Sequence, residues 1–154
     1  MHVYLIRHAH AVDADEDPER PLSKRGQAQV HALAAFLKQS AAFEPEEIWH
    51  SSLVRSRQTA EHLVRHMRLS APLTLVPGLE PEDDPHAMFR RIKASRRGVA
   101  VVGHEPHLSS LATLLIVGKT APPTFVMKKC CALALDGIDA HWSVRWHVSP
   151  ELFA

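Results

Sequence analysis

The hydrophobic positions of the chain follow two spacings that alternate along it, and this alternation predicts strands separated by helices. Uninterrupted apolar runs at 3–6 and 99–102 predict short strands that are buried on both faces, as in a parallel sheet. Apolar residues at i, i+3, i+4 and i+7 predict helices, and the clearest set follows Ser23, a predicted N-cap: Val30, Leu33, Ala34 and Leu37. Further strands are predicted at 48–51 and 73–76, and further helices at 53–67, 86–94 and 108–115.

The end of the chain shows a different pattern. Residues 130–135 and 142–148 predict two strands, which we expect to form a hairpin joined through Asp136 and Gly137. Repeated strand and helix patterns followed by a hairpin predict an α/β fold, a three-layer α/β/α sandwich whose sheet is mostly parallel. With 154 residues and no internal repeat or linker, we expect a single domain over residues 1–154.

Composition excludes several classes of protein. Hydrophobic residues make up 45% of the chain, charged residues 23%, and the net charge is +1, so the sequence indicates neither disorder nor a general affinity for nucleic acid or membranes. We see no signal peptide and no spanning segment of about 18 apolar residues. Cys130 and Cys131 are adjacent, which would strain a mutual disulfide, and no other cysteine exists. We therefore expect a cytoplasmic protein.

Arginine and histidine residues follow three of the predicted strands. Arg7 and His8 come after the first strand, Arg55 lies just beyond the second, and His104 follows the strand at 99–102. Ligands of open α/β sheets bind beyond the carboxyl ends of the strands, so these side chains are expected to converge. One guanidinium group can bind two phosphoryl oxygens at the same time, and the start of the helix near residue 53 adds free backbone N–H groups. The sequence thus predicts a site for a phosphoryl anion.

These residues also carry a resemblance to a known family. Three segments, in order, are similar to the signature segments of the histidine phosphatase superfamily, which has the phosphoglycerate mutase-like fold: Arg7-His8, residues 51–59 and Gly103-His104-Glu105-Pro106. The short chain, the segment 20–23 with Gly26, and the ending 142–150 resemble the SixA-type phosphohistidine phosphatases of that superfamily. The resemblance extends over nearly the whole chain.

The resemblance implies a role for each of the clustered residues. His8 would be the nucleophile that takes the phosphoryl group onto a ring nitrogen, Arg7 and Arg55 would bind the phosphoryl oxygens, and His104 would donate to them. An imidazole is largely unprotonated near neutral pH and can attack phosphorus, and water would then hydrolyse the phosphohistidine. Arg20 would either support the pocket or form an ion pair. Neither a metal nor a cofactor is implied.

Two positions depart from the family pattern. Ala9 stands where the family usually has glycine after the nucleophile, which changes the freedom of the backbone beside the phosphoryl group. Many relatives also use an acidic residue after the third strand to protonate the leaving group. Four acidic residues occupy this region, and Glu80 is our candidate: Glu80, Glu82, Asp83 and Asp84. A phosphohistidine substrate would need such an acid less, because protonated imidazole leaves readily.

The substrate and the chemistry leave alternatives open. Short loops favour phosphohistidine on a protein partner, such as a histidine-phosphotransfer protein, over a small phosphorylated molecule. A metal-dependent hydrolase built on His8, His10 and His104 is one rival, and a phosphate-binding module without catalysis is another. Clusters of basic residues, including Lys128 and Lys129, are either an ordinary solvated surface or a docking surface for an acidic protein.

Overall fold

The computed structural model describes residues 1–153 and shows alternating strands and helices that end in a hairpin. The elements, in chain order, are β1 (His2–Arg7), α1 (Lys24–Ser40), β2 (Glu47–His50), α2 (Val54–Met67), β3 (Leu73–Leu75), α3 (Pro85–Ser95), β4 (Val99–Gly103), α4 (His107–Val117), β5 (Ala132–Ile138), β6 (His141–Val148) and the short 3-10 helix η1 (Pro150–Leu152). Every predicted helix and strand is therefore present, with ends shifted by a few residues.

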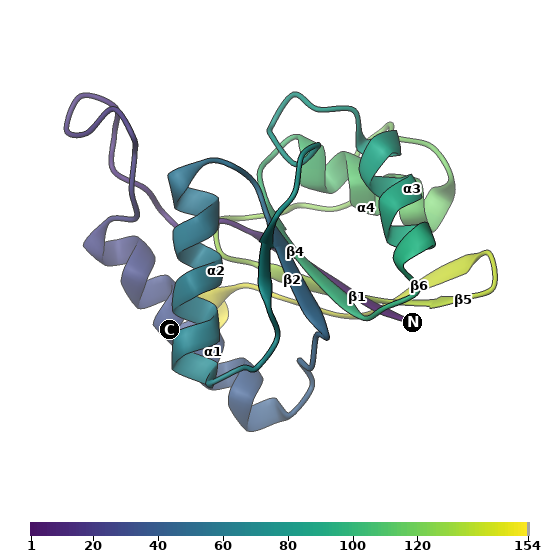
Figure 1. Cartoon of the computed structure of the whole chain (residues 1–154), viewed down its shortest axis with the longest axis horizontal. Helices are drawn as coiled ribbons and strands as arrows, with labels where there is room; N and C mark the ends of the chain where they lie inside the picture. Colours follow the sequence, from purple (N-terminus) through teal and green to yellow (C-terminus); the bar gives the residue numbers. More distant parts are fainter. Residues whose placement is uncertain (154) are drawn as a thin grey trace.

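One six-stranded sheet in the order β3-β2-β4-β1-β5-β6 forms the centre of the molecule. Strands β1 to β4 run parallel to one another, whereas β5 pairs antiparallel with β1 and β6 antiparallel with β5. Helices α1 and α2 cover one face and α3 and α4 the other (Figure 1). The predicted three-layer α/β/α sandwich with a mostly parallel sheet is confirmed.

Strand β1 shows why the central strands are apolar at every position. Its side chains alternate between the two faces of the sheet, as the pleat requires. Val3 and Leu5 pack in the hydrophobic cluster on the side of α3 and α4, and Tyr4 and Ile6 in the cluster on the side of α1 and α2. All four are nearly or fully buried. Because helices cover both faces, neither face of this strand can be polar.

The hairpin turn lies further along the chain than the sequence predicted. Asp136 and Gly137 belong to β5, and the turn falls at Asp139, which has a positive φ of 57°. Gly137 is glycine for a different reason: a Cβ there would come within 2.7 Å of ring atoms of Trp142 on β6. The Asp-Gly pair therefore indicates close packing across the hairpin, and the prediction of a turn at this pair was wrong.

Three smaller predictions also need correction. Cys130 precedes β5 instead of beginning it, because its φ of 61° is incompatible with a strand. Ser51 follows β2 and does not belong to it. The spacing also predicts that Phe89 and Ile92 face inward from the helix at 86–94, whereas in α3 Met88 and Ile92 are fully buried and Phe89 is only half-buried. These errors concern the ends of two strands and the buried face of one helix, and they leave the layers unchanged.

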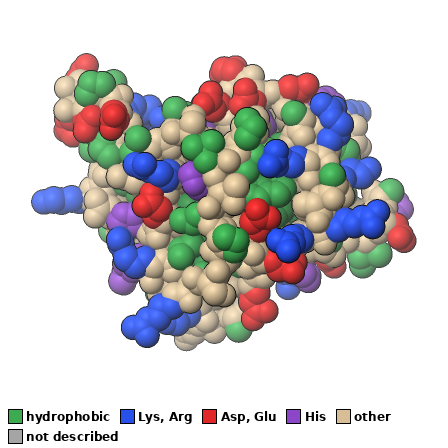
Figure 2. Space-filling view, viewed as in Figure 1, with side chains coloured by type: hydrophobic (Ala, Val, Ile, Leu, Met, Phe, Trp, Pro, Cys, Tyr) green, Lys and Arg blue, Asp and Glu red, His purple; other side chains and the backbone are tan. Residues whose placement is uncertain are grey.

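The loop between β1 and α1 projects from the body of the molecule (Figure 1). Acidic side chains gather at its tip (Figure 2), where the sequence contains Asp13, Asp15, Glu16, Asp17 and Glu19. Ala11 pairs with Leu22 at the base of the loop, which holds its two ends together. Over the described residues, no helix combines the length and the apolar character needed to cross a bilayer.

Candidate active site

The carboxyl ends of β1, β2 and β4 bring the predicted site residues together. His8 follows β1, Ser51 follows β2 and His104 follows β4, and these three strands are neighbours in the sheet. The His8 and His104 rings lie 5.1 Å apart between centroids, and both side chains are buried. The sequence prediction that distant segments would converge at this edge of the sheet is confirmed for the two histidines.

The His8 ring is held in one orientation by its own backbone neighbour. Its Nδ1 lies 2.7 Å from the carbonyl oxygen of Ala9, and the His8 backbone N–H donates to the Gly103 carbonyl at 3.0 Å. A carbonyl oxygen only accepts, so Nδ1 carries the proton of the neutral ring and Nε2 keeps its lone pair. The ring thus presents an unprotonated nitrogen.

Burial, followed by the positive charges of Arg55 and Arg7, lowers the pKa of His8 from 6.5 to about 4, although the Ala9 carbonyl acts in the opposite direction. The charged imidazolium is disfavoured because it would lose hydration and lie beside two cations. His8 is therefore neutral at physiological pH.

His104 is bound to the serine that follows β2. Its Nε2 lies 2.6 Å from Ser51 Oγ, which also accepts from the Leu53 backbone N–H at 3.2 Å. Its Nδ1 is buried and has no hydrogen-bond partner among residues 1–153. Burial, and then His8 and Arg55, lower the pKa of His104 to about 3. The two rings are thus both neutral and lie side by side.

The two predicted phosphoryl-binding arginines offer donors that the protein itself does not use. Arg7 Nη1 donates to the Met127 carbonyl at 2.9 Å, which fixes one side of its guanidinium group. The Nε atoms of Arg7 and Arg55 are buried and have no acceptor within the described chain. Burial and the charge of Arg20 lower the pKa of Arg55. Neither arginine forms an ion pair among residues 1–153, and cations without counter-charges favour the binding of an anion.

Arg20 lies near this site on the projecting loop. Its Nε donates to the Val12 carbonyl at 3.1 Å, its φ is 50°, and it forms no ion pair with any residue in the range 1–153. Its charge lowers the pKa of both Arg55 and Lys129. Of the two interpretations left open by the sequence, this geometry favours support of the pocket over an ion pair.

Several supporting residues were not singled out from the sequence. The Thr59 hydroxyl accepts from the Ala9 backbone N–H at 3.0 Å and donates to the Arg55 carbonyl at 2.7 Å, which ties α2 to the residue after His8. Gln58 accepts from the Leu22 N–H, and Gln29 from the His10 N–H. The only signal for Gln58 and Thr59 was their place in the matched segment 51–59.

Ala9 is accommodated without exposing its side chain. It is fully buried and packs in the hydrophobic cluster on the side of α1 and α2. Its methyl group therefore contributes to the core, while its backbone N–H and carbonyl hold Thr59 and His8. The core thus accommodates alanine at a position where the family usually has glycine.

Glu80, the candidate proton donor, lies at the rim. Its side chain is exposed, its carboxylate accepts a hydrogen bond from the Ser52 hydroxyl, and its backbone N–H donates to Asp83 at 2.8 Å. It lines a cavity of about 300 Å³ together with Gly78 and other residues of this loop. Its partner Ser52 is the chain neighbour of Ser51, which bonds to His104. Glu80 itself forms no hydrogen bond with His8 or His104.

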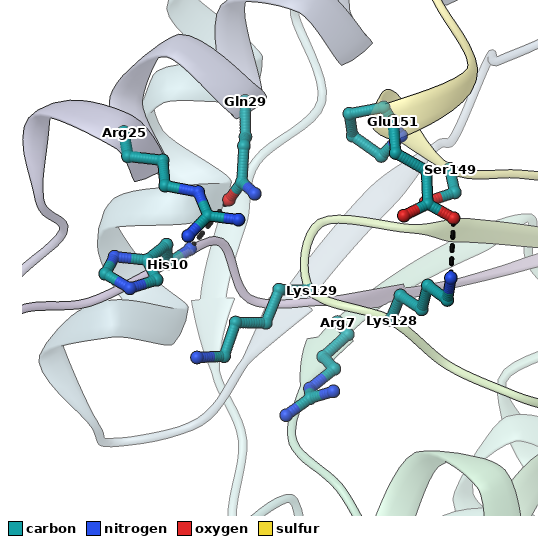
Figure 3. A pocket seen from close by; sticks show the side chains of 9 residues that line it. Arg7, His10, Arg25, Gln29, Lys128, Lys129, Ser149 and Glu151 are labelled. Atoms are coloured by element: carbon teal, nitrogen blue, oxygen red, sulfur yellow. Dashed lines mark hydrogen bonds and ion pairs between the residues drawn. The ribbon is translucent and has the colours of Figure 1, made fainter. Parts of the chain in front are cut away.

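His10 is not gathered with the other two histidines. Its Nδ1 lies 2.6 Å from Ser23 Oγ, and it lines a second hollow beside Arg7, Arg25 and Lys129 (Figure 3). Within the part of the chain that the structure describes, no three His, Cys, Asp or Glu side chains are arranged to hold a metal ion. The three-histidine arrangement of the metal-dependent alternative is therefore not found.

Comparison with known proteins places this geometry in a family. Residues 3–80 match the model of the histidine phosphatase superfamily, branch 1. An uncharacterized protein of Picosynechococcus sp. is 33% identical over 160 residues, which cover 99% of this chain and 94% of that protein. The structure of the protein histidine phosphatase SixA complexed with tungstate has a TM-score of 0.88 and 25% identity and is covered fully by this chain, as the chain is by it.

A second solved structure shows how widely the fold is used. The α-ribazole phosphatase of Shigella flexneri has a TM-score of 0.77 at 18% identity, with 97% of each chain covered. At that identity the likeness concerns the fold alone, and the same fold therefore serves an enzyme with a different name and substrate. On the family match and the full-length likeness to SixA, the chain belongs to the histidine phosphatase superfamily, is of the SixA type, and is a phosphatase.

Proposed function

We propose that the protein is a metal-independent phosphatase that forms a phosphohistidine at His8 and removes phosphoryl groups from phosphohistidine on a protein partner. The observation that carries the proposal is the state of the His8 ring: Nδ1 is engaged with the Ala9 carbonyl, so that a neutral Nε2 lies in a buried, cationic site. Such a nitrogen is a nucleophile at neutral pH.

The proposed reaction has two displacements at phosphorus. In the first, the Nε2 lone pair forms a bond to phosphorus while the bond from phosphorus to the leaving group breaks, and the leaving imidazole takes up a proton from solvent. In the second, water adds to phosphorus and returns a proton to solvent, the bond to Nε2 breaks, and inorganic phosphate leaves. Arg7, Arg55 and His104 stabilise the equatorial oxygens in both steps, mainly by charge and position.

Buried donors without partners support this role. The Nε atoms of Arg7 and Arg55 lack acceptors in the described chain, and a buried N–H without an acceptor costs free energy. The oxygens of a bound phosphoryl group would accept hydrogen bonds from both of these donors. In contrast, a catalytically idle module would not need the Nε2 of His8 to be kept free.

The choice of substrate rests on the SixA likeness and on the weak case for a general acid. SixA is a protein histidine phosphatase, and the likeness extends over both whole chains. Glu80 is exposed at the rim and bonds to Ser52, without a hydrogen bond to either histidine. A phosphorylated imidazole needs less help to leave than an alkoxide, because protonation of its ring, whose reference pKa is about 6.5, lets it leave as neutral imidazole.

A small phosphorylated molecule is the second candidate. It is favoured by the position of Glu80, which could protonate an alkoxide if the loop at 78–84 moved toward His8, and by the fold shared with α-ribazole phosphatase. Glu80→Gln distinguishes the two: it should strongly lower kcat for a phosphomonoester and leave the hydrolysis of phosphohistidine nearly unaffected.

The test compares two substrates in chelator-treated buffer: a phosphohistidine-bearing phosphotransfer protein and a set of small phosphomonoesters. We expect kcat/KM to be highest for the phosphoprotein and to resist prolonged chelation. Efficient hydrolysis of the phosphomonoesters without any of the phosphoprotein would overturn the choice of substrate. Loss of activity on chelation, with recovery on adding a divalent metal, would overturn the metal-independent mechanism.

A further inference from the structure

A large basic hollow adjoins the proposed phosphoryl site. It has a volume of about 570 Å³ and is lined by Arg7, His10, Arg25, Gln29, Lys128, Lys129, Ser149, Pro150 and Glu151. Four of these residues are Arg or Lys, and only Glu151 is acidic. The volume lies in the range of pockets that take a whole ligand or several side chains, which is more than one phosphoryl group needs. Hereafter this hollow is called the basic pocket.

Three of the four cations, all except Lys128, form no ion pair with any residue from 1 to 153. Lys128 Nζ lies 2.6 Å from Glu151 Oε1, so that Lys128 is already neutralised. Figure 3 shows Lys129 extending between His10 and Arg7, with Arg25 reaching in from α1. The pocket thus contains two free cations beside Arg7.

The local potential at Lys129 is positive. Burial, and then the charges of Arg7, Arg20 and Arg25, lower the pKa of the Lys129 ammonium, and only Asp13 acts in the opposite direction. Cations that are held near one another without carboxylates are an unfavourable arrangement in the free protein. An anionic group in the basic pocket would relieve this repulsion.

We propose that the basic pocket, through Lys129 and Arg25, binds an acidic side chain that a protein substrate carries close to its phosphorylated residue. Arg7 belongs to both places, because it lines the basic pocket and precedes His8, so the two anions would lie side by side. This inference rests on the proposed function for its substrate class. It adds a preference for substrates with an acidic side chain near the phosphorylated residue, which the phosphoryl site alone cannot supply.

The test uses two peptides that differ only beside one phosphohistidine, where one has glutamates and the other glutamines. The quantity measured is the acidic preference, which is kcat/KM for the first peptide divided by kcat/KM for the second. We expect about a tenfold preference in the wild type, the order expected of one charge-assisted contact between partly exposed groups. Lys129→Ala and Arg25→Ala should each reduce the preference to a few-fold, and Lys129→Glu should reverse it.

Lys24→Ala is the matched control, because Lys24 precedes Arg25 on α1 and is exposed as Arg25 is, but does not line the pocket. It should retain the wild-type preference. Binding of the same two peptides, with a non-hydrolysable phosphonotriazole in place of phosphohistidine, gives a readout that does not need turnover. Calorimetry should show the same preference in Kd.

The outcomes separate the two proposals. Absence of hydrolysis of both peptides, together with an acidic preference in binding that Lys129→Ala removes, would overturn the proposed function and leave the subsite standing. Hydrolysis of both peptides at equal kcat/KM would overturn the subsite alone. So would an acidic preference that survives in both Lys129→Ala and Arg25→Ala.

Discussion

At the scale of single residues, the chemistry depends on how the His8 ring is oriented. The residue type came from the sequence, but its tautomer depends on a 2.7 Å contact between Nδ1 and the Ala9 carbonyl that no pattern of residues reveals. The same contact leaves Nε2 unprotonated and directed away from that carbonyl. Family resemblance could predict a nucleophile at this position, and the structure adds the reason why its nitrogen is free.

The lowered pKa of His8 predicts the pH dependence of the free enzyme. Because the folded pKa is about 4 and not 6.5, the neutral, nucleophilic form persists as the pH falls through 6.5. After correction for ionisation of the substrate, kcat/KM should therefore stay level from about pH 8 to about pH 5 and decline only near pH 4.

An NMR titration of the His8 ring, identified by the signal that His8→Asn removes, measures the same pKa directly. A midpoint close to 4 is expected in the absence of substrate. A midpoint near 6.5, with kcat/KM falling in parallel, would show that burial and the two arginines do not act on His8 as described.

At the scale of elements, the loop after β1 is held in place by α1 and α2. Thr59 of α2 bonds to the Ala9 N–H, Gln29 of α1 bonds to the His10 N–H, and Ser23, the N-cap of α1, accepts from Gly26 and contacts the His10 ring. Of these residues, Ser23 and Thr59 belong to two of the matched segments, 20–23 and 51–59. They fix the backbone that positions His8.

Thr59→Val tests this support with almost no change in shape. The substitution leaves the buried Ala9 N–H without an acceptor, which should cost about 1–3 kcal/mol in the free energy of unfolding. Because the backbone beside His8 is released, kcat should also fall by about tenfold or more. Chemical denaturation and steady-state kinetics measure the two effects.

Thr113→Val is the control, since Thr113 is also buried, donates to the Ser109 carbonyl at 2.7 Å and accepts from the Thr124 N–H, but belongs to α4. It should lose similar stability and keep its kcat. Equal kinetic losses in both variants would mean that Thr59 acts only through global stability.

Gly26→Ala tests how closely α1 approaches the loop. A Cβ at Gly26 would lie 1.9 Å from the His10 carbonyl oxygen, so either the helix or the loop must move. Alanine is otherwise the better helix residue by about 1 kcal/mol. We nevertheless expect a net loss of about 1–3 kcal/mol in the free energy of unfolding, as for other overpacked sites, together with reduced kcat.

Gln27→Ala, at an exposed position on the same turn of α1, should change neither stability nor kcat appreciably. If Gly26→Ala proved as stable and as active as the wild type, the close contact between α1 and the His10 backbone would not be a constraint. Thermal or urea unfolding, followed by circular dichroism, decides the matter.

At the scale of the whole molecule, hydrophobic spacing was enough to predict the layers, the mostly parallel sheet and the edge at which the site forms. Strands such as 99–102 could be predicted because helices cover both faces. The hairpin turn could not, because Gly137 serves packing against Trp142 and not the turn. Local pattern does not distinguish these two uses of glycine.

The basic pocket was equally beyond prediction as a unit. It combines Arg7 at the end of β1 and His10 after it, residues of α1, Lys128 and Lys129 before β5, and residues around η1. These residues are brought together only by the folded chain. From the sequence, Lys128 and Lys129 were simply a basic pair with two interpretations. The structure separates them, because Glu151 pairs with Lys128 while Lys129 forms no ion pair among residues 1–153.

The central claim is a phosphoryl group bound covalently to His8, and the most direct test is the intact mass of the protein after rapid quenching without acid. Wild type and His8→Ala are mixed with a phosphohistidine substrate in chelator-treated buffer. We expect an adduct of about 80 Da on the wild type only, as covalent catalysis requires, and no turnover by His8→Ala. Retention of activity by His8→Ala, or an adduct that maps to another residue, would contradict the account.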